Sequence, residues 1–248
     1  MSIKLSKRMK SIADMVTPGR TVADIGCDHG YVSIYLVEEG IADKVYAMDV
    51  AEGPLGNARE SISERGLSDK IEARLSNGFE AIEAGQTDCA VISGMGGFLI
   101  MDIITDGLHK IEPGYELVLS PQSDVPLVRT FLREHGFEIT DEDMLSEDGK
   151  YYNIIKAKKI KGEISGETDS GSIDAKQLML YDTYGRRLIE KKHPVLREYL
   201  EKKAEKYQGL FCRISKQSGD KSVDRLSQLR TEIEDIEKVL ALLGESGR

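Results

Sequence analysis

Short apolar runs alternate with amphipathic segments through the first two thirds of the chain. The runs have the length and branched side chains of β-strands, and the segments between them repeat apolar residues at helical spacing. We predict seven strands, at 22–25, 44–50, 71–75, 90–93, 116–120, 137–144 and 151–157. We predict helices at 31–39, 54–65, 97–105 and 125–135. This alternation is typical of an α/β fold, with a mostly parallel sheet covered by helices on both faces.

The last two predicted strands follow one another with no helix between them. A polar segment at 146–149, Ser-Glu-Asp-Gly, separates them and predicts a hairpin, so the final pair is antiparallel. Seven strands ending in an antiparallel pair are the arrangement of the Rossmann-like sheet of methyltransferases that use S-adenosylmethionine (SAM). The dinucleotide-binding form of the fold has six strands.

The pattern changes after residue 160. Residues 161–173 are polar and rich in Gly and Ser, which predicts a linker. Beyond them, two stripes of apolar residues recur every three or four positions, at 200–214 and 226–243, around a turn at 217–220. We predict two helices of roughly 24 residues each, about 36 Å long, in an antiparallel hairpin or short coiled coil. The expected domains are a methyltransferase domain at 1–160 and a helical hairpin at 174–248.

Composition narrows the class of protein. Of the 248 residues, 40% are apolar and 31% charged, as expected for a chain with a packed core. The basic start lacks an apolar segment behind it, and no apolar run approaches the ~20 residues of a membrane span. The cysteines form no Cys-x-x-Cys pair and the histidines have no metal-ligand spacing. We expect a monomeric cytoplasmic protein with no metal and no membrane partner.

Charge is distributed unevenly. Residues 21–150 carry 26 acidic and 9 basic side chains, a net of −17. Residues 1–20 carry a net of +4, and residues 186–221 carry 11 basic against 5 acidic side chains. An acidic body with basic ends favours a nucleic-acid partner, because phosphate contacts dominate such binding. A solvated, charged helix explains the tail equally well, and charge alone does not separate the two.

The loop after the first predicted strand carries the clearest chemical signal. It reads Asp24-Ile-Gly26-Cys27-Asp28-His29-Gly30, and a helix is predicted to follow. Glycines at a strand-to-helix turn let a ligand lie against bare backbone, beside the free N–H groups of the helix. The spacing Asp-x-Gly-x-Asp-x-Gly is closer to the acidic loop of SAM methyltransferases than to the dinucleotide fingerprint Gly-x-Gly-x-x-Gly.

Further candidate cofactor contacts follow the next three strands. Asp49 ends the second strand, where an acidic group can accept hydrogen bonds from both ribose hydroxyls. Asn77 follows the third strand and can donate to and accept from an adenine edge. A glycine-rich turn follows the fourth strand. We predict cofactor contacts at Asp24, Gly26, Cys27, Asp28, Gly30, Asp49, Val50, Asn77, Gly78, Gly94, Met95 and Gly96.

Candidate catalytic residues are Asp28, His29 and Tyr31, which lie where the loop should face the methyl donor. Two of them also have a structural alternative: His29 as an ordinary polar side chain, and Tyr31 packed on the sheet. Ser120-Pro-Gln122 follows the fifth strand and is a candidate acceptor contact. The glycine-rich turn lacks the Asn-Pro-Pro-Tyr pattern common in enzymes that methylate exocyclic amines.

Together these motifs resemble the bacterial tRNA (adenine-N1)-methyltransferases of the TrmK family, which act on position 22. The resemblance rests on 5–8 (Leu-Ser-Lys-Arg), 23–30, 93–97 (Ser-Gly-Met-Gly-Gly), 117–122 and 147–152, with the helical tail, and covers nearly the whole chain. It implies SAM bound at 24–30, 49–50, 77–78 and 94–96, and tRNA engaged by the tail. One departure is visible: the family often has Gln-Pro-Asn where this chain has Ser120-Pro-Gln122.

Two other interpretations stay open from the residues alone. The chain could methylate a protein or small molecule, with the tail as a dimerisation element. It could also bind SAM without catalysis and use the tail as an interaction arm. A nicotinamide-dependent oxidoreductase is disfavoured, because the dinucleotide fingerprint is missing.

Overall fold

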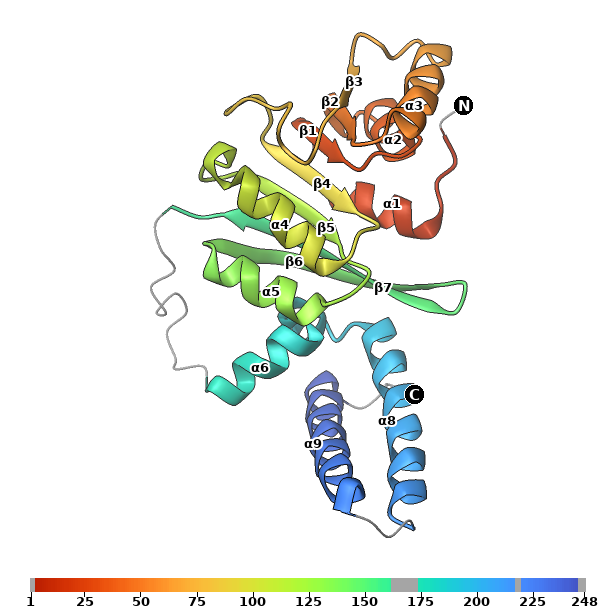
Figure 1. Ribbon diagram of the computed structural model, residues 1–248, viewed down its shortest axis with the longest axis vertical. Helices are drawn as coiled ribbons and strands as arrows, with labels where there is room; N and C mark the ends of the chain where they lie inside the picture. Colours follow the sequence, from red (N-terminus) through yellow and green to blue (C-terminus); the bar gives the residue numbers. More distant parts are fainter. Residues whose placement is uncertain (1–2, 162–173, 217–219, 245–248) are drawn as a thin grey trace. The chain divides into compact units, whose positions relative to one another are not determined.

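A computed structural model describes residues 3–161, 174–216 and 220–244, and shows the predicted α/β sheet (Figure 1). The sheet has seven strands in the order β3-β2-β1-β4-β5-β7-β6. All neighbouring pairs are parallel except β5–β7 and β6–β7. The strands are β1 (Arg20–Ile25), β2 (Ala42–Asp49), β3 (Ile71–Leu75), β4 (Cys89–Ser93), β5 (Glu116–Ser120), β6 (Phe137–Glu147) and β7 (Lys150–Lys159). The predicted seven-stranded fold class with its antiparallel final pair is therefore confirmed.

Helices cover both faces of this sheet and bury a separate core on each. The first core joins α1, α2 and α3 to one face, and the second joins α4 and α5 to the other. Each face excludes water on its own, so the sheet is buried on both sides as a mostly parallel sheet requires. The helices are α1 (Lys7–Asp14), α2 (Tyr31–Glu38), α3 (Glu52–Glu64), α4 (Gly97–Gly107) and α5 (Val125–Glu134), with a short 3₁₀ turn at Leu108–Lys110.

The antiparallel pair β6–β7 is joined by a tight turn at Asp148 and Gly149. Both residues have positive φ, 51° and 74°, as a two-residue turn of this hand requires, and Asp-Gly is a sequence that adopts it readily. Leu119 near the end of β5 pairs with Ile155, so β7 before residue 154 extends beyond β5. The hairpin therefore projects past the carboxyl edge of the parallel strands (Figure 1).

Helix α1 was not predicted from the sequence. It has only eight residues, too few to be stable alone. Contacts with the sheet hold it in place: Glu147 accepts a hydrogen bond from the backbone N–H of Lys7 at 2.8 Å, and Asp143 accepts one from Ser11. Beyond its end, the buried carboxylate of Glu116 accepts from the Thr17 backbone and hydroxyl at 2.9 and 2.6 Å. The basic start of the chain is thus fixed to the β6–β7 hairpin.

The chain divides into two compact units, Met1–Gly171 (the sheet unit) and Ser172–Arg248 (the helical unit). The helical unit contains α6 (Ala175–Tyr184), α7 (Arg186–Glu190), α8 (Pro194–Ile214) and α9 (Asp220–Leu243), of which α6 and α7 were not predicted. Helices α8 and α9 pack on each other. Leu200 and Leu229, one from each predicted stripe, are fully buried. The predicted linker and most of the predicted turn at 217–220 lie outside the described residues. A coiled coil stays a prediction.

None of the described helices combines the length and apolar content that crossing a lipid bilayer would require.

Candidate functional site

The predicted cofactor residues gather at the carboxyl ends of the parallel strands. The strand order reverses between β1 and β4, whose connections leave to opposite faces of the sheet. Open α/β sheets bind ligands at such a point, beside the carboxyl ends of the strands. The loop after β1 and the glycine-rich turn after β4 lie on the two sides of it.

The loop after β1 is held in a fixed shape by its own backbone. The N–H groups of Gly26 and Cys27 both donate to the carbonyl of Met48, at 2.8 and 2.9 Å. Gly26 has a φ of 76°, which disfavours any residue with a Cβ. A Cβ built on Gly26 would lie 2.2 Å from the terminal methyl of Met95. The turn after β4 therefore packs its Met95 side chain against this loop, and the positive φ is what favours glycine at position 26.

Asp49 ties the loop to the end of β2. One carboxylate oxygen accepts from the backbone N–H of Asp28 at 3.2 Å, and the other from that of Ala51 at 3.0 Å. Each carboxylate oxygen can accept more than one hydrogen bond, so both remain able to receive ribose hydroxyls. Asp49 thus occupies the position, and has the acceptor capacity, that its predicted ribose contact needs.

Asp24 lies under the loop. Its side chain is 4% exposed and accepts a 2.6 Å hydrogen bond from the hydroxyl of Ser33 on α2. Burial raises the pKa of Asp24 from 3.8 to about 6, although hydrogen bonds from Ser33 oppose the rise. A buried carboxylate below the cofactor loop makes its surroundings favourable for a positively charged ligand. The role of Ser33 could not be predicted, because a serine on the buried face of a helix has no recognisable sequence pattern.

Asp28 and His29 form the exposed rim of the loop. Asp28 adopts a φ of 51°, a conformation that aspartate tolerates better than most residues, and its side chain is 66% exposed. His29 Nε2 lies 3.7 Å from Asp28 Oδ1, and the His29 ring stacks on Tyr31 at 5.4 Å between centroids. The three predicted catalytic residues are therefore adjacent and accessible, while Cys27 beside them is buried, which raises the pKa of its thiol.

The remaining candidates lie along the same edge. Val50 after β2 is 67% exposed. Asn77 after β3 is exposed and donates from its amide to Glu80 at 3.2 Å. Gly78 follows with a φ of 57°, and a Cβ there would lie 3.2 Å from Ile103 of α4. Val50, Asn77 and Gly78 thus lie at the same edge of the sheet as Asp49.

The turn after β4 is fixed to the loop after β5 by hydrogen bonds. The N–H of Gly94 donates to the carbonyl of Ser120 at 3.2 Å, and the N–H of Gln122 donates to the carbonyl of Met95 at 2.9 Å. The N–H of Gly97 donates to the hydroxyl of Ser123 at 3.3 Å. A Cβ on Gly97 would lie 2.6 Å from the carbonyl oxygen of Ser123, so glycine is required there. These hydrogen bonds hold the two loops together.

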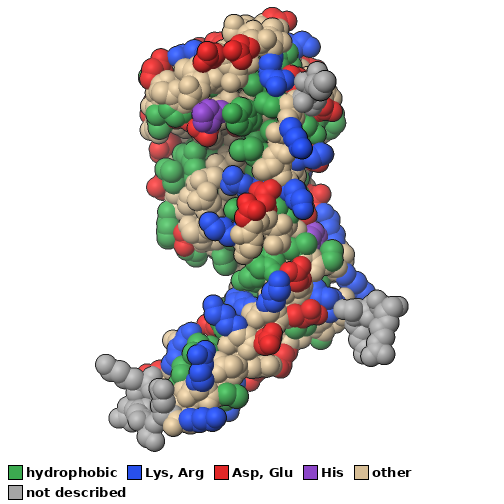
Figure 2. Space-filling view, turned by 90° about the vertical axis from the view of Figure 1, so that its right-hand side faces the viewer, with side chains coloured by type: hydrophobic (Ala, Val, Ile, Leu, Met, Phe, Trp, Pro, Cys, Tyr) green, Lys and Arg blue, Asp and Glu red, His purple; other side chains and the backbone are tan. Residues whose placement is uncertain are grey.

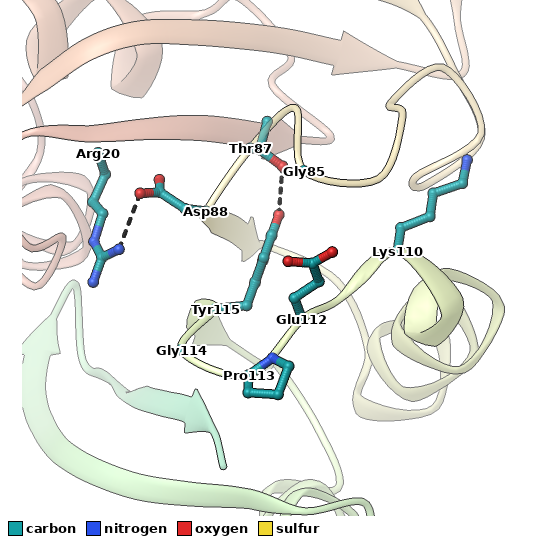
Figure 3. Close-up of a pocket in the computed structure, with 9 residues that line it drawn as sticks. All are labelled: Arg20, Gly85, Thr87, Asp88, Lys110, Glu112, Pro113, Gly114 and Tyr115. Carbon is teal, nitrogen blue, oxygen red and sulfur yellow. Dashed lines mark hydrogen bonds and ion pairs between the residues drawn. The ribbon is translucent and has the colours of Figure 1, made fainter. Parts of the chain in front are cut away.

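A separate hollow of about 250 Å³ lies at the opposite, amino-terminal edge of the sheet (Figure 3). Several of its polar groups bind one another or the backbone: Arg20 pairs with Asp88 at 3.0 Å, and the Lys110 ammonium donates to the Phe79 carbonyl at 2.8 Å. The hydroxyls of Thr87 and Tyr115 share a 2.7 Å hydrogen bond. We assign this hollow no function. Among the described residues, no cluster of three or more His, Cys, Asp or Glu side chains could hold a metal ion.

Known proteins of similar sequence and structure are methyltransferases. The family model of the methyltransferase domain matches residues 5–155. The chain is 29% identical over 239 residues to a Bacillus subtilis tRNA (adenine(22)-N(1))-methyltransferase, covering 96% of this chain and 98% of the relative. It is similar in structure to Streptococcus pneumoniae Sp1610, assigned as a tRNA (m1A22) methyltransferase, with a TM-score of 0.81 at 32% identity over 96% of this chain and 100% of the other. The same S. pneumoniae protein in complex with SAM gives a TM-score of 0.78 at 31% identity, again over 96% and 100%.

Proposed function

The chain belongs to the methyltransferase-domain family, and within it to the TrmK family; from this premise we propose that it methylates N1 of the adenine at position 22 of tRNA. It is a SAM-dependent methyltransferase. The observation that carries the proposal is the match over both units of the chain, together with the acidic glycine loop at the switch point. Because tRNA is a cytoplasmic substrate, the proposal also places the chain in the cytoplasm.

The residues around the loop fit the cofactor by their chemistry. Asp49 has free acceptor capacity for ribose, and Asn77 offers both donor and acceptor to an adenine ring. The Met95 methyl that lies against Gly26 belongs to a flexible side chain, which can move aside for a ligand. SAM, when bound, supplies an electrophilic methyl group. We assign Gly26 through Asp28, Gly30, Asp49, Val50, Asn77, Gly78 and Gly94 through Gly96 to its binding, with Asp24 holding the loop from beneath.

The chemistry at N1 asks mainly for positioning. The N1 lone pair of adenine lies in the ring plane and is nucleophilic without removal of a proton, so an aligned, close approach supplies most of the effect. The methylated ring carries a positive charge. The exposed carboxylate of Asp28 can stabilise that charge as it develops, with His29 and Tyr31 lining the same side.

Binding of tRNA is assigned to the basic ends of the chain. In the sheet unit, the Arg8 guanidinium lies 5.0 Å from the centre of the Tyr152 ring, on the hairpin that projects past the carboxyl edge. Among the described residues, no carboxylate pairs with Arg8. An arginine free of carboxylates in an acidic unit is suited to a phosphate. In the helical unit, the basic stretch 186–221 offers further phosphate contacts.

The decisive experiment is methyl transfer from SAM to unmodified tRNA transcripts, followed by mass spectrometry of the nucleosides. We expect N1-methyladenosine, and none with a transcript in which guanine replaces adenine 22. SAM binding without any methylated nucleoside would overturn the proposal and favour a protein or small-molecule acceptor. Methylation that persists after replacement of adenine 22 would refute the assigned position.

Charge reversal tests the binding surfaces separately from catalysis. Arg8→Glu should weaken tRNA binding and reduce its dependence on salt, because each lost phosphate contact lowers the slope by about one. SAM affinity should not change. Lys70→Glu removes one exposed lysine at the opposite edge of the same unit and serves as the matched control. Equal effects of the two variants would show that Arg8 makes no specific contact.

A further inference from the structure

Large apolar side chains that remain exposed in the sheet unit all lie at one edge. Described residues of this kind are Tyr31, Val50, Leu75, Phe98, Leu99 and Leu127, and each follows the carboxyl end of a parallel strand or stands in the first turn of the next helix. Figure 2 shows this side of the molecule, with apolar side chains gathered near a histidine. Exposed apolar side chains confined to a ligand-binding edge indicate a binding surface.

The proposed cofactor site accounts for only half of them. Tyr31, Val50 and Leu75 flank the loop after β1 and the end of β2 at Asp49. Phe98 and Leu127 stand on α4 and α5, two helices packed together on the other face of the sheet, and are 60% and 47% exposed. An exposed phenylalanine leaves in water an apolar area that a ligand could cover. These two side chains therefore indicate a second apolar contact on the α4–α5 side of the sheet.

Phe98 and Leu127 follow the two loops that hydrogen bonds join, the turn after β4 and the loop after β5. Gln122 is exposed there, and its amide nitrogen lies 3.9 Å from the place of a Cβ on Gly94. Its backbone N–H is fixed to Met95, and within the described residues its side-chain amide makes no hydrogen bond. Below it, the hydroxyl of Ser120 is buried and has no hydrogen-bond partner. Polar groups without partners, near exposed apolar side chains, offer the two kinds of contact that a nucleobase needs.

We propose that Gln122 reads the N6–N7 edge of the target adenine while Phe98 and Leu127 contact the face of the ring. The inference rests on the proposed function. A glutamine amide has an acceptor for the N6 amino group and a donor for a ring nitrogen, and it pairs with adenine in this bidentate way. Pairing through N1 would block the atom to be methylated. Pairing through N6 and N7 leaves N1 free on the neighbouring edge of the ring.

The preference for adenine over guanine follows from the donor and the acceptor of the same glutamine amide. Guanine presents two acceptors along the corresponding edge, N7 and O6, so the glutamine oxygen would face an oxygen. Flat apolar contacts from Phe98 bind any base by stacking and do not discriminate. Gln122 is therefore the specificity-determining residue, and the aromatic wall supplies affinity.

The test uses transcripts that carry 7-deazaadenosine at position 22, which lack only the N7 acceptor. Wild-type kcat/KM should fall roughly tenfold on this substrate, as for the loss of one hydrogen bond. On ordinary tRNA, Gln122→Ala should lower kcat/KM about tenfold or more. Its ratio of rates on the two transcripts should equal the ratio of chemical N1 reactivities of the two free nucleosides. Gln122→Glu, of equal size but without a donor, should behave like the alanine variant. SAM affinity should be unchanged in both.

Several outcomes would overturn the inference. Wild-type rates that are equal on both transcripts after correction for intrinsic N1 reactivity would show that N7 is not read. A loss on 7-deazaadenosine that persists in Gln122→Ala would assign N7 to another residue. Because the first result needs only the wild-type protein, a variant that fails to fold leaves the inference testable. Absence of N1-methyladenosine from ordinary tRNA refutes the proposed function itself.

The wall is tested by a second pair of variants. Phe98→Ala should raise KM for tRNA about tenfold, since stacking of a base on an aromatic ring contributes about 1–3 kcal/mol. Phe98→Tyr keeps the ring and should restore KM. If both variants raise KM equally, the ring does not stack on the base, and the effect is a disturbance of the α4 first turn.

Discussion

Replacement of Asp24 by Asn should stabilise the protein in the absence of SAM. The carboxylate is 4% exposed, and burial raises its pKa from 3.8 to about 6. A raised pKa in the folded state means that ionisation opposes folding. The favourable contribution of the neutral acid is complete below pH 3.8 and is lost as the pH rises through about 6. At neutral pH, the folded protein therefore carries a buried charge at a cost in stability.

The size of the effect follows from the difference between the two pKa values. One pKa unit corresponds to 1.36 kcal/mol, so the ionised carboxylate costs roughly 3 kcal/mol at pH 7.5. About 2 kcal/mol of this cost should appear between pH 4.5 and 7.5. The amide of Asn needs a partner that the carboxylate did not, which offsets the gain by about 1 kcal/mol at every pH. The pH-dependent part is therefore the cleaner measure.

Urea unfolding at a series of pH values between 4.5 and 7.5 gives the free energy of unfolding for both proteins. We expect the stability of the Asn variant relative to the wild type to increase as the pH rises. The difference should level off above about pH 6.5. Asp69→Asn, at an exposed position, should track the wild type throughout. At 100 times the wild-type Kd, SAM should raise the free energy of unfolding of the wild type by about 2.7 kcal/mol. The same SAM concentration should raise that of Asp24→Asn by less. A difference that is constant with pH, or that favours the wild type at high pH, would refute the reasoning.

Three further predictions address packing and catalysis. Arg129→Leu leaves the carboxylate of Glu142, 1% exposed, without its 2.7 Å ion pair and should cost about 3–5 kcal/mol of stability, measured by urea unfolding; a loss under 1 kcal/mol would contradict this. Gly97→Ala places a methyl 2.6 Å from a backbone oxygen and should cost about 1–3 kcal/mol, whereas Gly56→Ala, with open space around it, should be neutral or stabilising; equal melting temperatures would show that the loops yield. Asp28→Asn should lower kcat roughly tenfold or more while SAM affinity, measured by calorimetry, changes less; unchanged turnover would remove Asp28 from the mechanism.

The sheet could be predicted from sequence almost residue by residue, because its signal is local. Central strands buried on both faces are nearly continuous apolar runs, and β5, which is buried throughout, has the predicted limits. The edge strand β3 also has the predicted limits. Helix α1 was missed because its eight residues are too few to form a helix alone, and contacts with distant residues such as Glu147 hold it. Helix α7, with five residues, is shorter still. No window of sequence contains that information.

The position of the candidate site could be predicted for a related reason. Glycines at Gly26 and Gly94 mark places where backbone must turn or come close, and they follow strands whose carboxyl ends meet at one edge. Which side chain faces which loop could not be predicted. The contact of Met95 with Gly26 and the exposure of Gln122 depend on the distance between two loops nearly 70 residues apart in the chain.

The burial of the cysteines provides three built-in probes of motion. Cys212 on α8 is exposed and should react with a maleimide at once, without any change to the sequence. Cys27 and Cys89 are buried, and burial raises the pKa of both thiols, so each reacts only when its surroundings open. Cys89 lies in a central strand and should report unfolding of the whole sheet, whereas Cys27 should report opening of one loop. The labelling rates of one unmodified protein would therefore separate local from global opening. SAM should slow the labelling of Cys27 more than it slows the labelling of Cys212.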